Sequence, residues 1–316
     1  MRLKLVRKYP LAADICGFDL ADPAGRALPN FSAGAHIDVH LGSGLIRQYS
    51  LCNDPAERHR YAIGVLRDPK SRGGSVAMHA LEEGAEIEVG EPKNHFPLAA
   101  EARHSLLIAG GIGVTPILSM AESLARAGAS FELRYCTRSP VHTAFRERLS
   151  QPDLAARTRL YHDSAPEAER IDFAKLLAAP VPGSHLYVCG PGGFIDLVLG
   201  RAREAGWSEA QLHREYFAAP AAAAAGEDRP FEVELSSSGR RIGVAAGQSV
   251  VKALAGAGID ILTSCEEGVC GTCLTGVLAG EPDHRDVYLT GEEKAANDRF
   301  LPCCSRSHSP LLVLDL

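Results

Sequence analysis

The chain has 316 residues, of which 46% are hydrophobic and 23% charged, and its formal net charge at pH 7 is −6. No apolar run reaches the roughly 18–20 residues that span a bilayer, and an acidic chain lacks the basic surface that nucleic acid binding requires. Membrane and nucleic-acid partners are therefore excluded. The segment Met1–Val6 alternates polar and apolar residues, unlike a signal peptide, so we expect a cytoplasmic protein. A monomer is expected as well.

Residues 1–97 carry the pattern of an antiparallel β domain. Short runs with partial alternation are separated by Gly, Pro, Asn and Asp, and one helix is expected at Ser75–Leu81. Several short strands with a single helix indicate a small barrel. The expected strands are Arg2–Lys8, Ile15–Leu20, His36–Leu41, Ile46–Cys52, Tyr61–Leu66 and Glu86–Val89.

Two short motifs in this domain carry chemistry. The strand residues Arg47-Gln48-Tyr49-Ser50 offer a charge, an aromatic ring and a hydroxyl. The sequence Arg72-Gly73-Gly74-Ser75 precedes the helix, where free backbone N–H groups attract anions. Taken singly, these are a strand arginine and a helix cap. Taken together, they fit flavin mononucleotide, with its ring on the strand and its phosphate at the helix start.

From about residue 100 the pattern changes to alternating strands and helices, which predicts a parallel sheet with its site at the carboxyl ends of the strands. The strand Ser105–Ala109 enters the turn Gly110–Pro116, and the strand His185–Cys189 enters Gly190–Gly193. Both turns precede helices, so they could cradle a dinucleotide pyrophosphate. The alternative is two tight connections without a ligand. Further strands are expected at Phe131–Cys136 and Arg159–His162, and helices at Ala144–Leu149, Asp172–Leu177 and Phe194–Ala205.

A stretch rich in Pro and Ala, residues 218–228, separates this region from the last part of the chain and is interpreted as an interdomain linker. The last part is expected to hold a hairpin of Phe231–Leu235 and Arg241–Val244, a helix at Ser249–Gly256 and a final strand at Leu311–Leu314. The proposed boundaries are residues 1–99, 100–220, 221–228 for the linker, and 229–316.

Four cysteines in the last part have the spacing of a 2Fe–2S cluster. Cys265, Cys270 and Cys273 follow the pattern C-x4-C-x2-C, and Cys303 lies well downstream. A structural zinc site is the alternative, but it would usually repeat the C-x2-C pair. The segment 226–316 also holds fourteen acidic against eight basic residues, whereas the preceding part has twenty-five of each. This excess is either a surface for a basic electron-transfer partner or simply a solvated face.

With these motifs in view, the whole chain resembles the phthalate dioxygenase reductase family, which includes vanillate O-demethylase reductases. The resembling segments are Arg47–Asn53, Arg72–Ser75, Gly110–Pro116, Cys189–Pro191, Cys270–Thr275, Gly280–Asp286 and Leu301–Arg306. The resemblance implies three domains: an antiparallel β-barrel that binds FMN, a parallel α/β domain that binds NAD(H), and an α+β (β-grasp) plant-type ferredoxin domain. Cys304 departs from the family pattern, because an apolar residue is usual there, and it competes with Cys303 as the fourth ligand.

The resemblance also implies site residues. The ligands of the cluster would be Cys265, Cys270, Cys273 and Cys303. Residues near the reacting groups would be Ser50, Thr115, Cys189 and Glu215, although Cys189 could be a plain buried cysteine and Glu215 a helix carboxylate. Cofactor contacts would come from Arg47, Gln48, Tyr49, Ser50, Gly64, Val65, Leu66, Arg72, Gly73, Gly74, Ser75, Gly110, Gly111, Gly113, Thr115, Pro116, Thr137, Arg138, Cys189, Gly190, Pro191 and Phe217.

The expected function is an electron relay. NADH would reduce FMN, FMN would reduce the 2Fe–2S cluster, and the cluster would reduce a Rieske-type aromatic oxygenase or O-demethylase. NADH is preferred over NADPH, although Arg138 lies where a 2′-phosphate could be recognised. The alternative is a redox sensor or electron-carrier module without nicotinamide turnover. A self-contained oxygenase is a further reading, but no Rieske Cys/His pairs and no two-His-one-carboxylate signature stand out.

Overall fold

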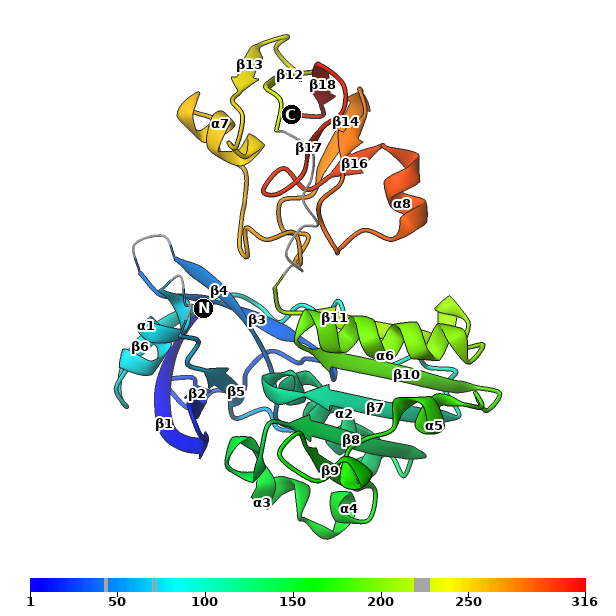
Figure 1. Ribbon diagram of the computed structural model, residues 1–316. Coiled ribbons are helices and arrows are strands. Elements are labelled where there is room, and N and C mark those ends of the chain that lie inside the picture. The colour runs from blue at the N-terminus through cyan, green and yellow to red at the C-terminus, as the bar shows by residue number, and fades with distance from the viewer. Residues whose placement is uncertain (43–44, 70, 72, 219–227) are drawn as a thin grey trace. The chain divides into compact units, whose positions relative to one another are not determined.

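The computed structural model describes residues 1–42, 45–69, 71, 73–218 and 228–316. Its contacts divide the chain into two compact units, Met1–Glu215 and Tyr216–Leu316. Figure 1 shows the first unit as two sheets with their helices and the second as a smaller sheet with short helices. The segment 221–227 of the expected linker and residue Arg72 lie outside the described residues.

A six-stranded antiparallel sheet in the order β4-β3-β6-β1-β2-β5 forms the first part of the first unit. A bridge between Leu51 and Ile63 joins the two ends of this order, which closes the sheet into a barrel. The barrel core is formed by alternating inward side chains such as Leu3, Leu5 and Ile63. The elements are β1 (Arg2–Ala12), β2 (Ile15–Ala21), β3 (His36–His40), β4 (Ile46–Ser50), β5 (Tyr61–Leu66), α1 (Gly74–Ala80) and β6 (Glu86–Val89).

A five-stranded sheet in the order β11-β10-β7-β8-β9 forms the second part of the first unit, and its neighbours β10, β7, β8 and β9 pair in parallel. The strands are β7 (His104–Gly110), β8 (Phe131–Thr137), β9 (Thr158–His162), β10 (Ser184–Gly190) and β11 (Leu212–Tyr216). The helices are η1 (Gly111–Gly113), α2 (Val114–Arg126), α3 (Arg146–Leu149), α4 (Pro152–Ala155), α5 (Phe173–Leu177) and α6 (Gly192–Glu204), with short 3₁₀ turns η2 (Pro140–His142), η3 (Glu167–Glu169) and η4 (Glu209–Gln211).

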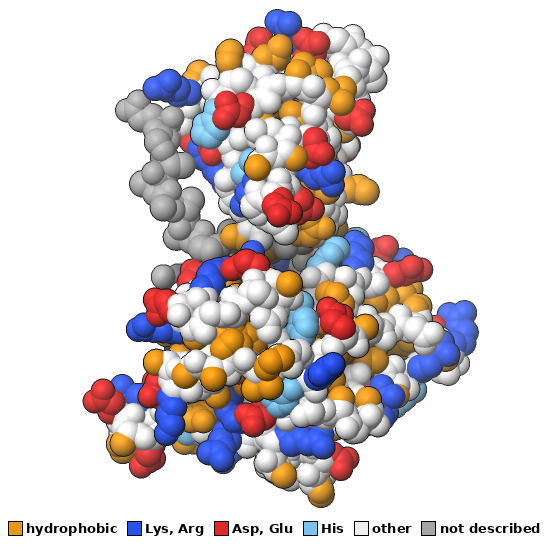
Figure 2. Space-filling model, turned by 90° about the vertical axis from the view of Figure 1, so that its right-hand side faces the viewer, with side chains coloured by type: hydrophobic (Ala, Val, Ile, Leu, Met, Phe, Trp, Pro, Cys, Tyr) orange, Lys and Arg blue, Asp and Glu red, His pale blue; other side chains and the backbone are white. Residues whose placement is uncertain are grey.

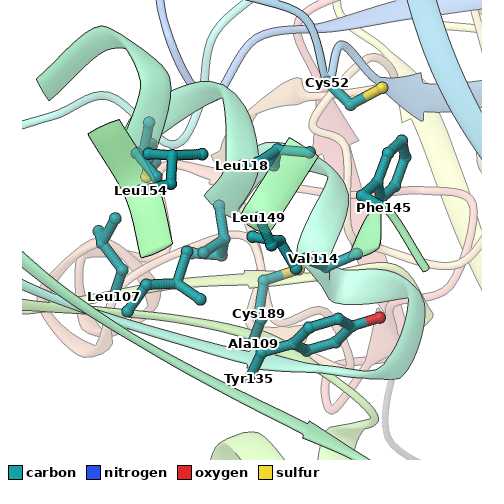
Figure 3. Packing of buried hydrophobic residues seen from close by; sticks show 14 of the residues in the cluster. Cys52, Leu107, Ala109, Val114, Leu118, Tyr135, Phe145, Leu149, Leu154 and Cys189 are labelled. Atoms are coloured by element: carbon teal, nitrogen blue, oxygen red, sulfur yellow. The ribbon is translucent and has the colours of Figure 1, made fainter. Parts of the chain in front are cut away.

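The barrel and the parallel sheet share one hydrophobic core. Cys52 and Ala62 of the barrel belong to the same buried cluster as Leu107, Val114 and Phe145 of the α/β part. Figure 3 shows Cys52 beside the ring of Phe145 in this cluster. Burial of apolar surface contributes roughly 25 cal/mol per Å², so a continuous core of this kind fixes the two sheets against each other.

The second unit is built on a mixed sheet in the order β13-β12-β18-β14-β16, in which β12 and β18 are parallel and the other pairs antiparallel. Helix α7 begins at a side-chain cap, where the Ser249 hydroxyl accepts from the Lys252 N–H. The elements are β12 (Phe231–Leu235), β13 (Arg241–Val244), α7 (Val250–Gly256), β14 (Thr275–Ala279), β15 (Pro282–Asp283), α8 (Gly291–Ala296), β16 (Arg299–Phe300), β17 (Arg306–Ser307) and β18 (Leu311–Leu314).

The expected fold class is confirmed: an antiparallel barrel, a parallel α/β sheet and an α+β unit follow one another. The strand β11 was not predicted, because Leu212–Tyr216 mixes charged and apolar residues without clear alternation. Among the described residues, none of the helices has the length and apolar character that crossing a membrane requires. Figure 2 shows acidic, basic and apolar side chains interspersed over one face of the molecule.

Candidate electron-transfer site

A hydrogen bond joins β4, which carries the Arg47–Ser50 motif, to the α/β sheet. The Ser50 hydroxyl at the end of β4 donates to Oε2 of Glu215 on β11 over 3.3 Å. Burial raises the pKa of Glu215 from its ordinary value to about 8. The reading of Glu215 as a helix carboxylate is wrong, since the residue lies on a strand. The first unit thus brings together the Ser50 hydroxyl and the Glu215 carboxyl group, which can exchange a proton near neutral pH.

The predicted phosphate position gathers Arg47 and the start of α1. A Cβ added at Gly74 would lie 2.6 Å from Cγ and 2.8 Å from Nε of Arg47, so this side chain lies directly over the helix start. Gly73 caps α1 with a φ of 98°, a backbone conformation that glycine adopts without a Cβ penalty. The Ser75 hydroxyl accepts from the Asp68 N–H. A cation beside the N–H groups of a helix start suits a phosphate.

The remaining residues of the motif on β4 point in different directions. The Gln48 amide donates to Oδ1 of Asp38 on β3, so its side chain is held by the neighbouring strand. Tyr49 packs against the barrel core, and burial raises the pKa of its hydroxyl. On β5, Gly64 and Val65 are buried, and Leu66 is exposed.

The barrel strand β5 touches the start of helix α2. A Cβ at Gly64 would lie 3.0 Å from Cγ2 of Thr115 and 3.0 Å from the ring of Phe145. The Thr115 hydroxyl donates to the Ile112 carbonyl and is buried. Glycine at position 64 therefore allows the predicted flavin and nicotinamide segments to approach closely.

The two glycine turns are direct neighbours at the carboxyl ends of β7 and β10. A Cβ at Gly113 would lie 2.3 Å from the Cys189 carbonyl oxygen and 2.6 Å from the Gly190 nitrogen. A Cβ at Gly190 would lie 3.0 Å from Cα of Gly110. Gly111 has a φ of 55°, and Pro116 lies in the first turn of α2. Pro191 precedes α6 as its cap. The two turns therefore form one backbone surface.

Three further predicted residues lie nearby with different exposure. Cys189 is fully buried, and Figure 3 shows it within the cluster that contains Val114. Burial, and secondarily the charge of Glu215, raises the pKa of its thiol. The Thr137 hydroxyl is buried and hydrogen-bonded to Thr143 and His162, and Arg138 is exposed. Phe217 follows β11, belongs to the second unit and is 39% exposed.

The cysteines of the second unit contact one another in two groups. Cys265 and Cys270 contact each other, and this contact lowers the pKa of Cys270 and raises that of Cys265. Cys303 contacts Cys273, and this contact raises the pKa of Cys303 to about 12. Backbone N–H groups of Glu267 and Thr272 point at the sulfur atoms of Cys265 and Cys270, at 3.3 Å and 3.5 Å. Donors of this kind favour thiolate sulfur.

Two contacting pairs of thiols suit a 2Fe–2S cluster. Its two irons need two thiolates each, and the pairs Cys265–Cys270 and Cys273–Cys303 supply them. The loop can come close because Gly268 and Gly271 both have a φ of 72°. A Cβ at Gly271 would collide with the ring of Tyr288, at 2.3 Å.

Sequence reasoning missed the residues that fix the barrel to the α/β part. The Ser119 hydroxyl on α2 donates to the Asn53 carbonyl over 2.9 Å, and Asn53 accepts from the Ala62 N–H. Arg148 donates to the Cys52 carbonyl and pairs with Glu122. The partners Asn53 and Ala62 are close in sequence, but in the other contacts the two residues are separated by 26 to 96 positions along the chain. No local pattern carries such information.

Two family models match the chain. Residues 233–308 match the 2Fe-2S iron-sulfur cluster binding domain, which covers the cysteine loop and Cys303. Residues 92–212 match the N-terminal domain of the dimethylamine monooxygenase subunit DmmA-like family, which covers both glycine turns.

Curated relatives match over almost the whole length. A vanillate O-demethylase oxidoreductase of Pseudomonas putida is 57% identical over 314 residues, which is 99% of this chain and 98% of the relative. A phthalate dioxygenase reductase of Burkholderia cepacia is 41% identical over 318 residues, which is 100% of this chain and 97% of the relative. A solved structure described as phthalate dioxygenase reductase, a modular structure for electron transfer from pyridine nucleotides to [2Fe-2S], is similar with a TM-score of 0.77 and 41% identity, covering 100% of this chain and 98% of that one.

Proposed function

The chain belongs to the family of phthalate dioxygenase reductases and vanillate O-demethylase oxidoreductases, and from this premise we propose that it reduces a Rieske-type aromatic oxygenase or O-demethylase with electrons from NADH. It is an oxidoreductase, and its cofactors are FMN, NADH and a 2Fe–2S cluster. The observation that carries the proposal is the 57% identity to a vanillate O-demethylase oxidoreductase over 99% of the chain.

When bound, FMN accepts a hydride from NADH, and the 2Fe–2S cluster carries single electrons onward. The protein's part is to bind and orient these groups. We assign Arg47, Gly73, Gly74 and Ser75 to the FMN phosphate, because Arg47 lies over the glycine at the start of α1. Tyr49 is assigned to the flavin ring.

The place of hydride transfer is assigned to Ser50, Thr115, Cys189 and Glu215. Ser50 donates a hydrogen bond to Glu215, and the charge of Glu215 raises the pKa of Cys189, so two of these residues are coupled to the carboxyl group of a third. Thr115 reaches the same region through its contact with Gly64. The Ser50 hydroxyl donates its hydrogen bond to the Glu215 carboxyl group, and Glu215 would hold or release a proton near pH 8.

The nicotinamide dinucleotide is assigned to the surface formed by the two glycine turns. Backbone N–H groups at the start of α2 and α6 suit its pyrophosphate. The remaining cofactor contacts follow the resemblance to the family: Gln48, Val65, Leu66, Arg72, Gly110, Gly111, Gly113, Pro116, Thr137, Arg138, Gly190, Pro191 and Phe217. The cluster is assigned to Cys265, Cys270, Cys273 and Cys303.

The function is tested by mixing the purified protein with NADH without oxygen and recording flavin and iron–sulfur absorbance. Both should bleach, and a Rieske-type oxygenase component added next should become reduced in turn. NADPH serves as the comparison, and a strong preference for it would contradict the NADH assignment. A protein whose flavin is not reduced by NADH would instead be an electron carrier or redox sensor. A protein that reduces its own cluster but no Rieske-type oxygenase would contradict the proposed partner.

A further inference from the structure

The second unit contains a fifth thiol beside the four assigned ligands. Its cysteines are Cys265, Cys270, Cys273, Cys303 and Cys304, and the other four cysteines of the chain belong to the first unit. Cys304 is therefore the one cysteine of this unit without an assigned role. It follows Cys303 directly, in the short segment between β16 and β17.

The backbone of this segment turns so that both cysteines face the same loop. The Ser305 N–H donates to the Leu301 carbonyl over 2.9 Å, and the Cys304 N–H donates to it over 3.2 Å, which makes one helix-like turn. In such a turn consecutive side chains are only about 100° apart, whereas in a strand they point to opposite faces. Both sulfur atoms can therefore lie on one side of the chain.

Contacts place both sulfur atoms at the cysteine loop. A Cβ at Gly268 would lie 2.5 Å from Sγ of Cys304, so this sulfur lies directly over the backbone of the loop. The Gly268 N–H hydrogen-bonds to Cys303, and the two thiols of Cys303 and Cys304 contact each other. Both side chains pack against the buried cluster of Cys273, Leu289 and Leu301. The sulfur of Cys304 therefore lies beside that of Cys303, over the same loop.

The hydrogen bonds distinguish the two. Cys303 contacts Cys273, its assigned partner on the same iron. The Cys304 thiol instead donates to the Leu301 carbonyl over 3.7 Å. Because Cys303 is the one of the two that contacts Cys273, we assign Cys303 as the ligand in the intact protein, with Cys304 beside it.

We propose that Cys304 is a reserve ligand of the 2Fe–2S cluster, which takes the place of Cys303 when the sulfur of Cys303 is lost or blocked. The S–H bond of Cys304 breaks, its proton goes to solvent, and an Fe–S bond forms to the iron that has lost Cys303. No electrons are exchanged in this step. The inference rests on the proposed function, because that function supplies the cluster.

The test compares the full chain with the variants Cys303→Ala, Cys304→Ala and the double variant. Alanine is chosen because a serine hydroxyl could itself bind iron. Iron and sulfide content, visible absorbance and the electron paramagnetic resonance spectrum after dithionite reduction are measured. Cys303→Ala should retain most of its iron with a changed spectrum, Cys304→Ala should keep the wild-type spectrum, and the double variant should lose the cluster.

A matched control is Cys270→Ala. The neighbour of Cys270 is Cys265, which is already assigned to the cluster, so this variant has no spare thiol and should lose the cluster. An iron content in Cys303→Ala as low as in the double variant would overturn the proposal. A cluster lost from Cys304→Ala but kept in Cys303→Ala would overturn it as well. A wild-type protein without any 2Fe–2S spectrum would instead contradict the proposed function.

Discussion

At the scale of single residues, Glu215 combines a structural contact with an unusual protonation state. Its carboxyl group accepts from Ser50, and this bond alone would lower its pKa. Burial is the larger cause, and the pKa rises to about 8. A carboxyl group with a pKa near the working pH can exchange protons readily, which is the property expected of an acid or base beside a reacting group.

The raised pKa of Glu215 predicts how stability depends on pH in protein stripped of FMN. Between about pH 4.5 and about pH 8 the folded state binds a proton that the unfolded state releases. This contribution to stability is therefore complete below about pH 4.5 and is lost as the pH rises through about 8. Glu215→Gln should remove that part of the pH dependence, measured as the change in Tm between about pH 6 and about pH 9.

Glu209→Gln is the control for this measurement. The hydrogen bond from Arg203 lowers the pKa of Glu209, so Glu209 is ionised throughout that pH range and its replacement should not alter the slope. A Glu215→Gln variant whose Tm falls as steeply with pH as that of the wild type would show that another group is responsible.

At the scale of elements, the two glycine turns depend on each other. Gly113 ends the turn after β7, and its Cα faces the backbone of Cys189 at the end of β10. Backbone atoms cannot rotate away as a flexible side chain can, so any Cβ at this position must push the turns apart. The two turns can therefore lie this close only because Gly113 has no side chain.

Gly113→Ala should weaken NADH binding without removing FMN. The added Cβ would lie 2.3 Å from the Cys189 carbonyl oxygen, and the two turns must separate to accept it. We expect the KM for NADH to rise about tenfold or more, which corresponds to roughly 1.4 kcal/mol or more, while the FMN content per chain stays unchanged. Steady-state reduction of ferricyanide by NADH measures the KM for NADH, and flavin absorbance measures the FMN content.

Gly200→Ala, within α6 and beyond the turn, is the matched control, because a Cβ at Gly200 would meet no atom within 4 Å. It should behave as the wild type. Equal KM values for NADH in Gly113→Ala and the wild type would contradict the assignment of the nicotinamide dinucleotide to these turns.

At the scale of the whole molecule, charge is divided unequally between the parts of the chain. Residues 226–316 carry the entire excess of acidic residues, and the residues before them are balanced. On the face in Figure 2, basic side chains are interspersed with the acidic ones, so on that face the field is that of a net charge and not of one acidic patch. Such a field attracts a basic partner over about 8–10 Å at physiological salt.

This asymmetry predicts that electron delivery to the oxygenase depends on salt. Raising the ionic strength from about 50 to about 200 mM should slow reduction of the oxygenase about three- to tenfold at low protein concentration. Reduction of the protein's own flavin by NADH, followed in the same solutions by rapid mixing, is the reference and should change less. Equal salt dependence of both rates would assign the acidic excess to a merely solvated surface.

The sequence by itself determined the order of the three modules, most strand positions and the nature of the cofactors. It could do so because strand alternation, glycine turns before helices and the C-x4-C-x2-C spacing are local patterns, and chemistry requires those residue types at short range. The strands Tyr61–Leu66 and Glu86–Val89 lie where the pattern predicted them. Strand β11 shows the limit, because Glu215 has no local sign of its place in a sheet.

Only the tertiary structure decided which distant residues meet. Ser50 and Glu215 are 165 residues apart, and their contact exists because the barrel and the parallel sheet share one core. The same holds for Gly64 against Thr115 and for the two glycine turns. It also holds for Cys304, whose sulfur reaches Gly268 because a turn directs two consecutive side chains to one side. Pair contacts of this kind depend on packing, and packing is not encoded in any single segment.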